Sequence, residues 1–315
     1  MLKNRIKNIL KNQMVLIILI LLFVLLIIIS PSFGDPQNFL NLIKKITIMG
    51  IIACGLTLTI INGDLDLSVG STFSLAGVIA IMLQPYGLIL ALTMPILACI
   101  LVGFINGFIT TKFKVNSIIV TLGMLSVIKG IALITSNGRN QLGQLGHPYS
   151  KIAQTEFFGI PSYVFIFIVI AIVLYIILQK TTFGRFIYLT GSNAEAAKIS
   201  GIKTDKVRIT TFIICAVCAG IASILLSSRM TAATPYSGDG FEFEAITAAL
   251  IGGNSLAGGK GGIYNTVLGV LLVAVLGNGM LLLGLPFAVQ ELSRGLLIIV
   301  AIFIDQKLRK KEFAI

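Results

Sequence analysis

"MVLIILILLFVLLIIIS", residues 14–30, is apolar throughout except for its final serine. Crossing the hydrocarbon core of a bilayer takes about 20 apolar residues in a helix, so this run predicts a membrane span. A secretory signal peptide is the alternative, because small residues follow the run and basic residues precede it: Lys3, Arg5, Lys7 and Lys11. The run is longer than the usual core of a signal peptide and many apolar runs follow it, so we expect an uncleaved first helix.

The composition of the whole chain is that of a membrane protein. Of its 315 residues, 56% are apolar and 11% are charged, whereas a soluble domain has about 45–50% and about 25%. One globular core cannot enclose this much apolar surface, so lipid is the expected surrounding. The net charge of +12 does not indicate nucleic acid as a partner, because the basic residues fall in short clusters between apolar runs.

Ten apolar runs predict an all-α polytopic membrane protein with a single transmembrane domain over residues 1–315. Gly, Pro and charged residues separate the runs. The expected spans are 14–30, 44–62, 67–84, 88–111, 116–135, 160–179, 209–227, 241–257, 263–284 and 286–304. Eight spans with two re-entrant segments would also be compatible with both termini on one side.

The distribution of Lys and Arg predicts the orientation of these spans. Cytoplasmic segments of membrane proteins collect basic residues. With the N-terminus inside and ten spans, 17 of the 24 Lys and Arg residues lie in cytoplasmic segments, and both termini are cytoplasmic. Lys44 and Lys45, which we expect in an outside segment, fit this arrangement worst.

The stretch "INGDLDLSVGS", residues 61–71, places two carboxylates between apolar runs. Asp66 is a natural N-cap for a helix that begins at Leu67, and the small residues permit close helix packing. The alternative is a helix break that faces a transport path, since non-helical backbone at membrane depth needs protein or water around it. The candidate residues for a path or a helix break are Asp64, Asp66, Ser68, Gly70 and Ser71.

A second interruption, "LIGGNSLAGGKGG" at residues 250–262, packs six glycines around Asn254 and Ser255, two further candidate path residues. A phosphate-binding loop would require the pattern G-x-x-x-x-G-K-[ST]. The chain has Asn254 in place of the first glycine and Gly261 in place of Ser or Thr. We therefore predict that this chain does not hydrolyse ATP.

Few other residues suggest chemistry. The cysteines all lie within apolar runs, so neither a disulfide framework nor a metal site is expected: Cys54, Cys99, Cys215 and Cys218. His147 stands alone in a polar loop.

Charges inside predicted spans are functional candidates by default. Glu291 and Arg294 are spaced i, i+3, which allows an ion pair on one helix face. Lys129 has no obvious partner on its own helix. Structural pairing and a role in lining a path are both open for these three residues.

The charged loop 180–208 contains a predicted short helix. Ser192 and Glu195 form the capping-box pattern S-x-x-E, which predicts a helix of about eight residues beginning near Asn193, and Gly201 is placed to end it. So short a helix is marginal on its own in water. We expect it to dock in a protein groove; the alternative is that its basic flanks rest on anionic lipid.

Three stretches together resemble a known family. Glu195-Ala196-Ala197 followed by Gly201 resembles the E-A-A-x-x-x-G coupling loop of ABC importer permeases. "NGDLDLSVGS", "GSNAEAAKISGI" and "GGNSLAGGKGGIYNTVLG" closely resemble, in the same order, stretches of the ribose-type permeases of bacterial sugar ABC importers. The similarity runs from about residue 40 to about residue 305. The usual "GGIDLSVGS" of that family stands here as "NGDLDLSVGS", so Asp64 makes the turn more acidic.

The resemblance implies a ten-helix permease of the bacterial cytoplasmic membrane that imports a monosaccharide, ribose first, by alternating access. A cytoplasmic ABC ATPase would bind ATP and Mg, and a second permease copy, expected to form a homodimer, and an extracytoplasmic sugar-binding protein would complete the importer. The chain itself would hold no cofactor, metal or catalytic residue. The implied ATPase-coupling residues are Ser192, Glu195, Ala196, Ala197 and Gly201.

Two other classes of protein are alternatives. A stand-alone secondary carrier or channel would need a buried carboxylate in mid-span, for which Glu291 is the best candidate. Glu242 and Glu244 lie only at the edge of the span 241–257. A membrane enzyme would need a His cluster, a metal-ligand spacing or a catalytic dyad, and the sequence has none of these.

Overall fold

The computed structural model describes residues 14–312, which form a predominantly helical bundle. The described helices are α2 Met14–Ile29, α3 Pro36–Ile61, α4 Val69–Leu83, α5 Leu88–Lys112, α6 Ser117–Ser136, α7 Pro148–Gln154, α8 Ser162–Lys180, α9 Thr182–Ser192, α10 Ala194–Ile199, α11 Thr204–Met230, α12 Phe241–Ile251, α13 Ile263–Leu282 and α14 Phe287–Glu312. Short 3₁₀ turns η1 and η2 cover Pro31–Gly34 and Gln84–Tyr86. Two antiparallel pairs of two-residue strands join β1 Gln141–Leu142 to β4 Ala232–Ala233 and β2 Glu156–Phe157 to β3 Ile160–Pro161.

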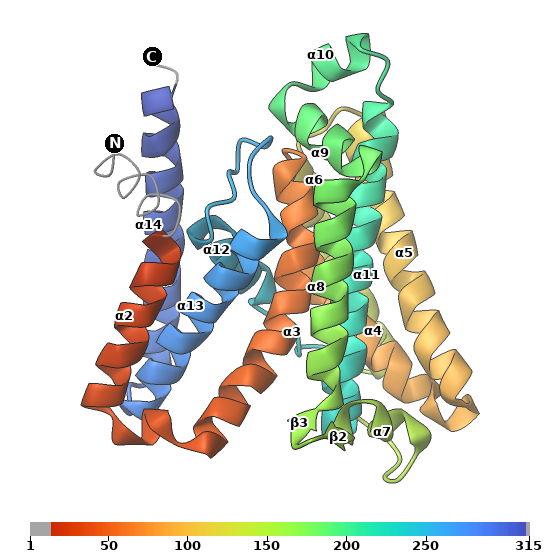
Figure 1. Cartoon of the computed structure of the whole chain (residues 1–315). Helices are drawn as coiled ribbons and strands as arrows, with labels where there is room; N and C mark the ends of the chain where they lie inside the picture. The colour runs from red at the N-terminus through yellow and green to blue at the C-terminus, as the bar shows by residue number, and fades with distance from the viewer. Residues whose placement is uncertain (1–13, 313–315) are drawn as a thin grey trace.

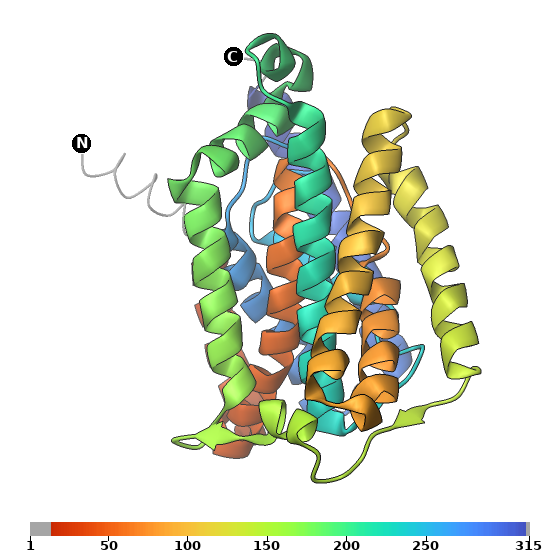
Figure 2. The same cartoon turned by 90° about the vertical axis from the view of Figure 1, so that its right-hand side faces the viewer.

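The bundle has two ends that carry different elements (Figure 1). α9 and α10 lie at one end, called here the α10 end, and α7, β2 and β3 lie at the other, called the α7 end. In the view turned by 90°, α6 forms the edge of the bundle, beyond α5 and α4 (Figure 2). Within the described residues, seven helices are long and apolar enough to cross a membrane: α3, α4 with η2, α5, α6, α8, α11 and α13. The predicted polytopic all-α membrane protein is confirmed.

α3 and α11 form the centre of the bundle. Every residue of α3 from Ile46 to Ile61 is buried, which agrees with a helix that is apolar on all sides. Small residues bring the helices close: a Cβ on Gly55 of α3 would lie 2.6 Å from Cys218 Cβ of α11. Gly103 and Gly107, one turn apart on α5, face the α11 backbone in the same way, as small-xxx-small pairs do in membranes. The four cysteines are buried and free.

All ten predicted apolar runs contain helix, and the helix of the second run begins before the predicted span 44–62. α3 begins at Pro36, where proline fits the first helical position because its missing N–H would be unpaired there anyway. Lys44 and Lys45 therefore lie inside a spanning helix and not in an outside loop. This explains why they fitted the charge distribution badly.

The eighth predicted span, 241–257, is helical in part. α12 covers eleven residues, Phe241–Ile251, or about 16 Å at 1.5 Å per residue. Gly252 follows because a Cβ there would overlap the carbonyl oxygen of Asn265, and Gly253 adopts a φ of +98°. Apart from β4, the segments 231–240 and 252–262 on either side are turns and irregular backbone. α12 is thus a half-length helix.

The lone His147 has a local structural contact. Its Nδ1 accepts a hydrogen bond from the Tyr149 N–H at 3.2 Å, at the start of α7. Pro148 follows it at the first helical position. His147 is the N-cap of this short helix.

Candidate functional site

α10, the predicted coupling helix, ends in a complete Schellman motif. Gly201 adopts a φ of +83°. Its N–H donates to the Lys198 carbonyl oxygen at 3.0 Å, and the Ile202 N–H donates to the Ala197 carbonyl oxygen at 3.0 Å. Ala197 and Ile202 are both buried, which supplies the apolar contact that usually accompanies this motif. Gly201 therefore ends the helix as the sequence predicted.

The predicted capping box at the start of this helix was wrong. Ser192 is the last residue of α9, so its backbone is helical and does not have the extended conformation of an N-cap. Asn193 has that conformation, and its Oδ1 accepts the Ala196 N–H at 3.0 Å. α10 is six residues long, shorter than expected, and Glu195 lies exposed in its first turn.

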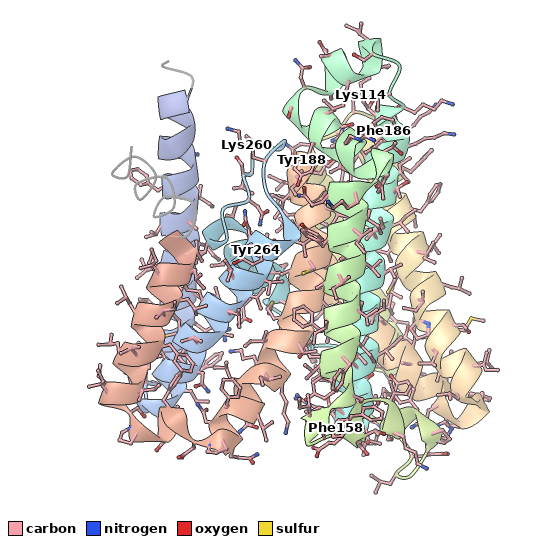
Figure 3. The ribbon with its side chains drawn as sticks, viewed as in Figure 1. Lys114, Phe158, Phe186, Tyr188, Lys260 and Tyr264 are labelled. Carbon is pink, nitrogen blue, oxygen red and sulfur yellow. The ribbon has the colours of Figure 1, made fainter. Side chains whose placement is uncertain are left out.

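The α10 end presents apolar side chains outside the bundle. Ile199 of α10 is 88% exposed. Phe186 and Leu189 of the adjoining α9 are also exposed, and Figure 3 shows Phe186 at the α10 end of the bundle. Large apolar side chains grouped on an exposed surface mark interaction sites. α9 and α10 together therefore have the surface of a docking element.

Three segments far apart in sequence meet at the α10 end through their main chains. The Gly259 N–H donates to the Ile61 carbonyl oxygen at 2.7 Å. A Cβ on Gly191 would overlap that oxygen, and one on Gly258 would lie 2.6 Å from the Gly191 carbonyl oxygen and 3.0 Å from Gly63 Cα. We call Gly63, Gly191, Gly258 and Gly259 the glycine junction. Glycine is required here because any side chain would push the three segments apart.

The side chain of Asn254 holds the irregular loop that enters the glycine junction. Its Nδ2 donates to the Ala249 carbonyl oxygen at 2.6 Å and to Thr266 Oγ1 at 2.8 Å, while its Oδ1 accepts the Gly262 N–H at 2.7 Å. Thr266 Oγ1 also lies 2.6 Å from Thr57 Oγ1 on α3. All four side-chain bonds are buried, so the loop is tied to α3, α12 and α13.

Tyr188 of α9 makes a further link to the same loop. Its hydroxyl donates to the Gly261 carbonyl oxygen at 2.8 Å and accepts from Gln179 Nε2 at 2.9 Å. Burial raises the pKa of the Tyr188 phenol, which keeps it a donor. Figure 3 shows Tyr188 and Lys260 close to each other at the α10 end. Ser255 closes the loop, since its N–H donates to the Lys260 carbonyl oxygen at 3.2 Å.

Asp64 binds the start of α11. Arg208 donates two hydrogen bonds to the buried carboxylate, one from Nε to Oδ2 at 2.8 Å and one from Nη2 to Oδ1. Asn62 Nδ2 adds a third, at 3.1 Å. A fork-like, bidentate pair of this kind fixes geometry as well as charge. The additional acidic residue of this turn therefore ties the α3–α4 connection to α11.

Asp66 does not cap a helix at Leu67 as predicted, because α4 begins at Val69. Its Oδ1 accepts the Ser68 N–H at 2.9 Å and the Ser68 hydroxyl at 2.6 Å, and Asn106 of α5 donates to Ser68 Oγ at 2.8 Å. Burial raises the pKa of the Asp66 carboxyl, against the effect of these bonds. The predicted interruption between α3 and α4 is present, and the side chains around it make buried hydrogen bonds to protein.

Gly70 and Ser71 lie in the first turn of α4 and are buried. A Cβ on Gly70 would overlap the Glu242 carboxylate of α12. α4 and the N-terminal end of α12 therefore touch at this glycine.

The charges predicted inside the membrane form two groups. Arg294 pairs with Glu291 at 2.6 Å, as the i, i+3 spacing predicted, and also with Glu244 of α12 at 2.8 Å. Lys129 of α6 pairs with Asp239, and its Nζ lies 4.4 Å from the centre of the Tyr236 ring. Asp239 and Glu244 line one cleft, so the two groups meet near the start of α12.

Several functional candidates were missed by sequence reasoning. Asn106 could have been identified from the sequence, because it is a polar residue within the apolar run 88–111. Arg208 was assigned to a loop, and Glu244 was placed at a span edge without its partner Arg294. Nothing in the sequence marked Tyr188 as a candidate. Over residues 14–312, no group of three or more His, Cys, Asp or Glu side chains is placed to hold a metal ion.

Comparison with known proteins identifies the family. A family described as "Branched-chain amino acid transport system / permease component" matches residues 38–304. The chain belongs to this permease family. It is accordingly a multi-pass protein of the cytoplasmic membrane.

Individual relatives of this permease are named as sugar transporters. The chain is 36% identical over 289 residues to the ribose import permease protein of Bacillus subtilis (strain 168), covering 89% of this chain and 88% of the relative. It is 31% identical to the ribose import permease protein of Escherichia coli (strain K12), with 89% and 88% covered. It is 33% identical to the L-arabinose ABC transporter permease protein of Azospirillum brasilense, with 90% and 84% covered. No solved structure matches the chain.

Proposed function

We propose that this chain is the membrane-spanning subunit of an ATP-driven importer and passes a pentose, ribose first, across the cytoplasmic membrane by alternating access. The observation that carries the proposal is the glycine junction, which joins α9, the helix directly before the exposed and capped α10, to two other segments of the bundle. The names of the relatives support a sugar as the solute. The family description supports a branched-chain amino acid as the second solute class.

The α10 end is the cytoplasmic end in this proposal. The segments there are rich in basic residues, as the positive-inside rule requires: Lys112, Lys114, Lys180, Arg185, Lys198, Lys203 and Lys206. The chain crosses ten times, with α12 and the irregular segment 231–240 together making the eighth crossing. Both termini are then cytoplasmic, because α2 and α14 both extend toward the α10 end (Figure 1).

ATP hydrolysis belongs to a partner ATPase, which binds ATP and Mg and receives α10 in a cleft. Two permease copies, as a homodimer, and an extracytoplasmic sugar-binding protein complete the importer. Closure of the ATPase moves α10, and the glycine junction passes this displacement to α3, α12 and α13. Contacts between main chains have no rotamers to absorb the movement, so the displacement is passed on.

The residues near the two helix interruptions hold the junction in this proposal and do not line the path. Asp64, Asp66, Ser68 and Asn254 are buried and hydrogen-bonded to protein. Ser255 closes its own loop. Their contacts give the coupling segments a fixed geometry.

Co-purification with a candidate sugar-importer ATPase tests the docking role of α10. Gly201→Asp should abolish binding, because the Schellman motif needs its positive φ and the new carboxylate faces the ATPase. Gly138→Asp is the matched control: its φ is +66°, no atom lies within 4 Å of a Cβ there, and it follows the end of α6 away from α10. Failure of the unmodified chain to bind, or equal loss in both variants, would contradict the proposal.

Uptake into vesicles tests the solute. The assembled importer should accumulate labelled ribose with ATP inside the vesicle, and unlabelled leucine should not compete. Uptake of labelled leucine in the same vesicles, without uptake of labelled ribose, would move the chain to the second solute class.

A further inference from the structure

A charged cleft opens between α3, the C-terminal end of α11, the start of α12 and α14. Its volume is about 610 Å³, within the range of about 300–1,000 Å³ typical of small-molecule sites. Its charged and amide side chains are those of Asn41, Lys44, Lys45, Arg229, Asp239, Glu244 and Arg294. These side chains are mixed in charge, with donors and acceptors in one cavity.

The cleft lies within the length of the spanning helices. Lys44 and Lys45 are about 12–13 Å along α3 from Pro36, and the whole helix is about 39 Å long. Ionisable groups at such depth are costly to hold and usually serve a function. Lys44 and Lys45, which fitted the predicted distribution of basic residues worst, therefore both lie at this cleft.

The two lysines differ from the carboxylates of the cleft, which are already paired. Asp239 is paired with Lys129, and Glu244 with Arg294. Among the side chains described for residues 15–303, no carboxylate lies within ion-pair distance of the Lys44 or Lys45 ammonium group. Their donors are available to a solute in the cleft.

A polyhydroxyl solute matches this mixture. Ammonium and amide groups donate hydrogen bonds and carboxylates accept them, while each hydroxyl group does both. A simple anion would meet the carboxylates and a simple cation would meet the lysines. Phe241 also lines the cleft, and its ring is held edge-to-face by Phe73, with centroids 5.0 Å apart. Such a ring offers an apolar surface to the carbon side of a sugar.

We infer that the permease itself holds the sugar during transport, in this cleft, with Lys45, Asn41 and Glu244 as hydrogen-bonding partners and Phe241 as the apolar surface. The inference rests on the proposed function and adds a solute site within the membrane subunit. Glu244 is in the first turn of α12, whose other end is hydrogen-bonded by Asn254, in the loop that leads to the glycine junction. Movement of α10 therefore changes the lining of the cleft and releases the sugar.

Labelling of Lys45→Cys tests occupancy directly. The four native cysteines are at most 4% exposed, so they contribute little background. The permease–ATPase complex without binding protein is treated with a small thiol reagent at rising ribose concentration. Labelling should slow in a saturable way, by about threefold at a concentration about twice the dissociation constant, following the factor 1 + [L]/Kd. Lys151→Cys, exposed on α7, is the matched control and should not respond to ribose.

Three results would overturn the solute site: no slowing at Lys45→Cys, slowing that does not saturate, or equal slowing at Lys151→Cys. Leucine in place of ribose should leave labelling unchanged, and protection by leucine alone would assign the cleft to an amino acid.

Uptake by Asn41→Leu separates this inference from the proposed function. One lost hydrogen bond corresponds to about a fivefold fall in ribose uptake per ATP hydrolysed, and binding to the ATPase should be retained. Asn140→Leu, exposed in the loop after α6, should transport normally. Normal uptake by Asn41→Leu would contradict the solute site in the cleft but not the proposed function. Absence of ribose uptake by the unmodified chain would overturn the proposed function.

Discussion

Replacing Gly191 by alanine is the sharpest perturbation of the glycine junction. Gly191 is helical, so alanine by itself would favour α9 by about 0.5–1 kcal/mol. The added Cβ would overlap the Ile61 carbonyl oxygen and lie 2.7 Å from Gly259 N. Both neighbours are main-chain atoms, and the 2.7 Å hydrogen bond between them would break.

The cost of that methyl group can be worked out from these contacts. Overpacking costs about 1–3 kcal/mol, and the lost hydrogen bond about 1 kcal/mol. After the gain in helix propensity, the net destabilisation is about 1–3 kcal/mol. Because α10 and its caps stay intact, we also expect the variant to bind the ATPase while its sugar uptake per ATP falls.

Unfolding in mixed detergent micelles measures the change in stability, and co-purification with vesicle uptake measures the change in coupling. Gly123→Ala on α6 is the matched control, since it is a helical glycine with no atom within 4 Å of a Cβ. It should be as stable as the parent or more so, with full uptake. If Gly191→Ala behaves like Gly123→Ala in both assays, the junction is not a close contact and the reasoning is refuted.

Three further predictions follow from buried polar groups. Thr266→Val should lower the unfolding free energy by about 1–3 kcal/mol, because it leaves buried partners unpaired; an unchanged melting temperature would contradict this. Glu244→Gln should cost about 1–3 kcal/mol, since its side chain is 8% exposed and loses its charge while Arg294 keeps Glu291, whereas Glu291→Gln, at 46% exposure, should cost under about 1 kcal/mol; equal melting curves would count against the burial argument. Because burial raises the pKa of Asp66, its contribution to stability is present below about pH 4 and lost as the pH rises through the raised value, so the melting temperature of the parent should fall relative to Asp66→Asn over that interval, and parallel pH curves would refute it.

The sequence predicted the elements whose signals are local. Apolar runs located the long helices, Gly201 marked the end of α10, and the spacing of Glu291 and Arg294 gave their ion pair. These features depend on neighbours within a few residues, where periodicity and backbone preference are decisive.

Features that depend on long-range contacts could not be predicted in the same way. Ser192 fits a capping box as well as Asn193 fits an N-cap, and the choice depends on how far α9 continues. The half-length of α12 is set by Gly252 against Asn265, which is a contact between two helices. The cleft likewise combines α3 with α12 and α14, and the motifs alone gave no sign that Lys45 and Glu244 line the same cavity.

The half-length of α12 also bears on how such permeases diversify. In the proposed mechanism, the contacts that receive movement from α10 lie at its C-terminal end, and the side chains that line the cleft lie in its first turn, about 16 Å away. Substitutions at one end leave the other chemically untouched. During evolution, the solute site at one end of α12 could therefore change while the contacts that couple the permease to the ATPase stay the same, or the reverse. α12 is the boundary between these two parts of the permease.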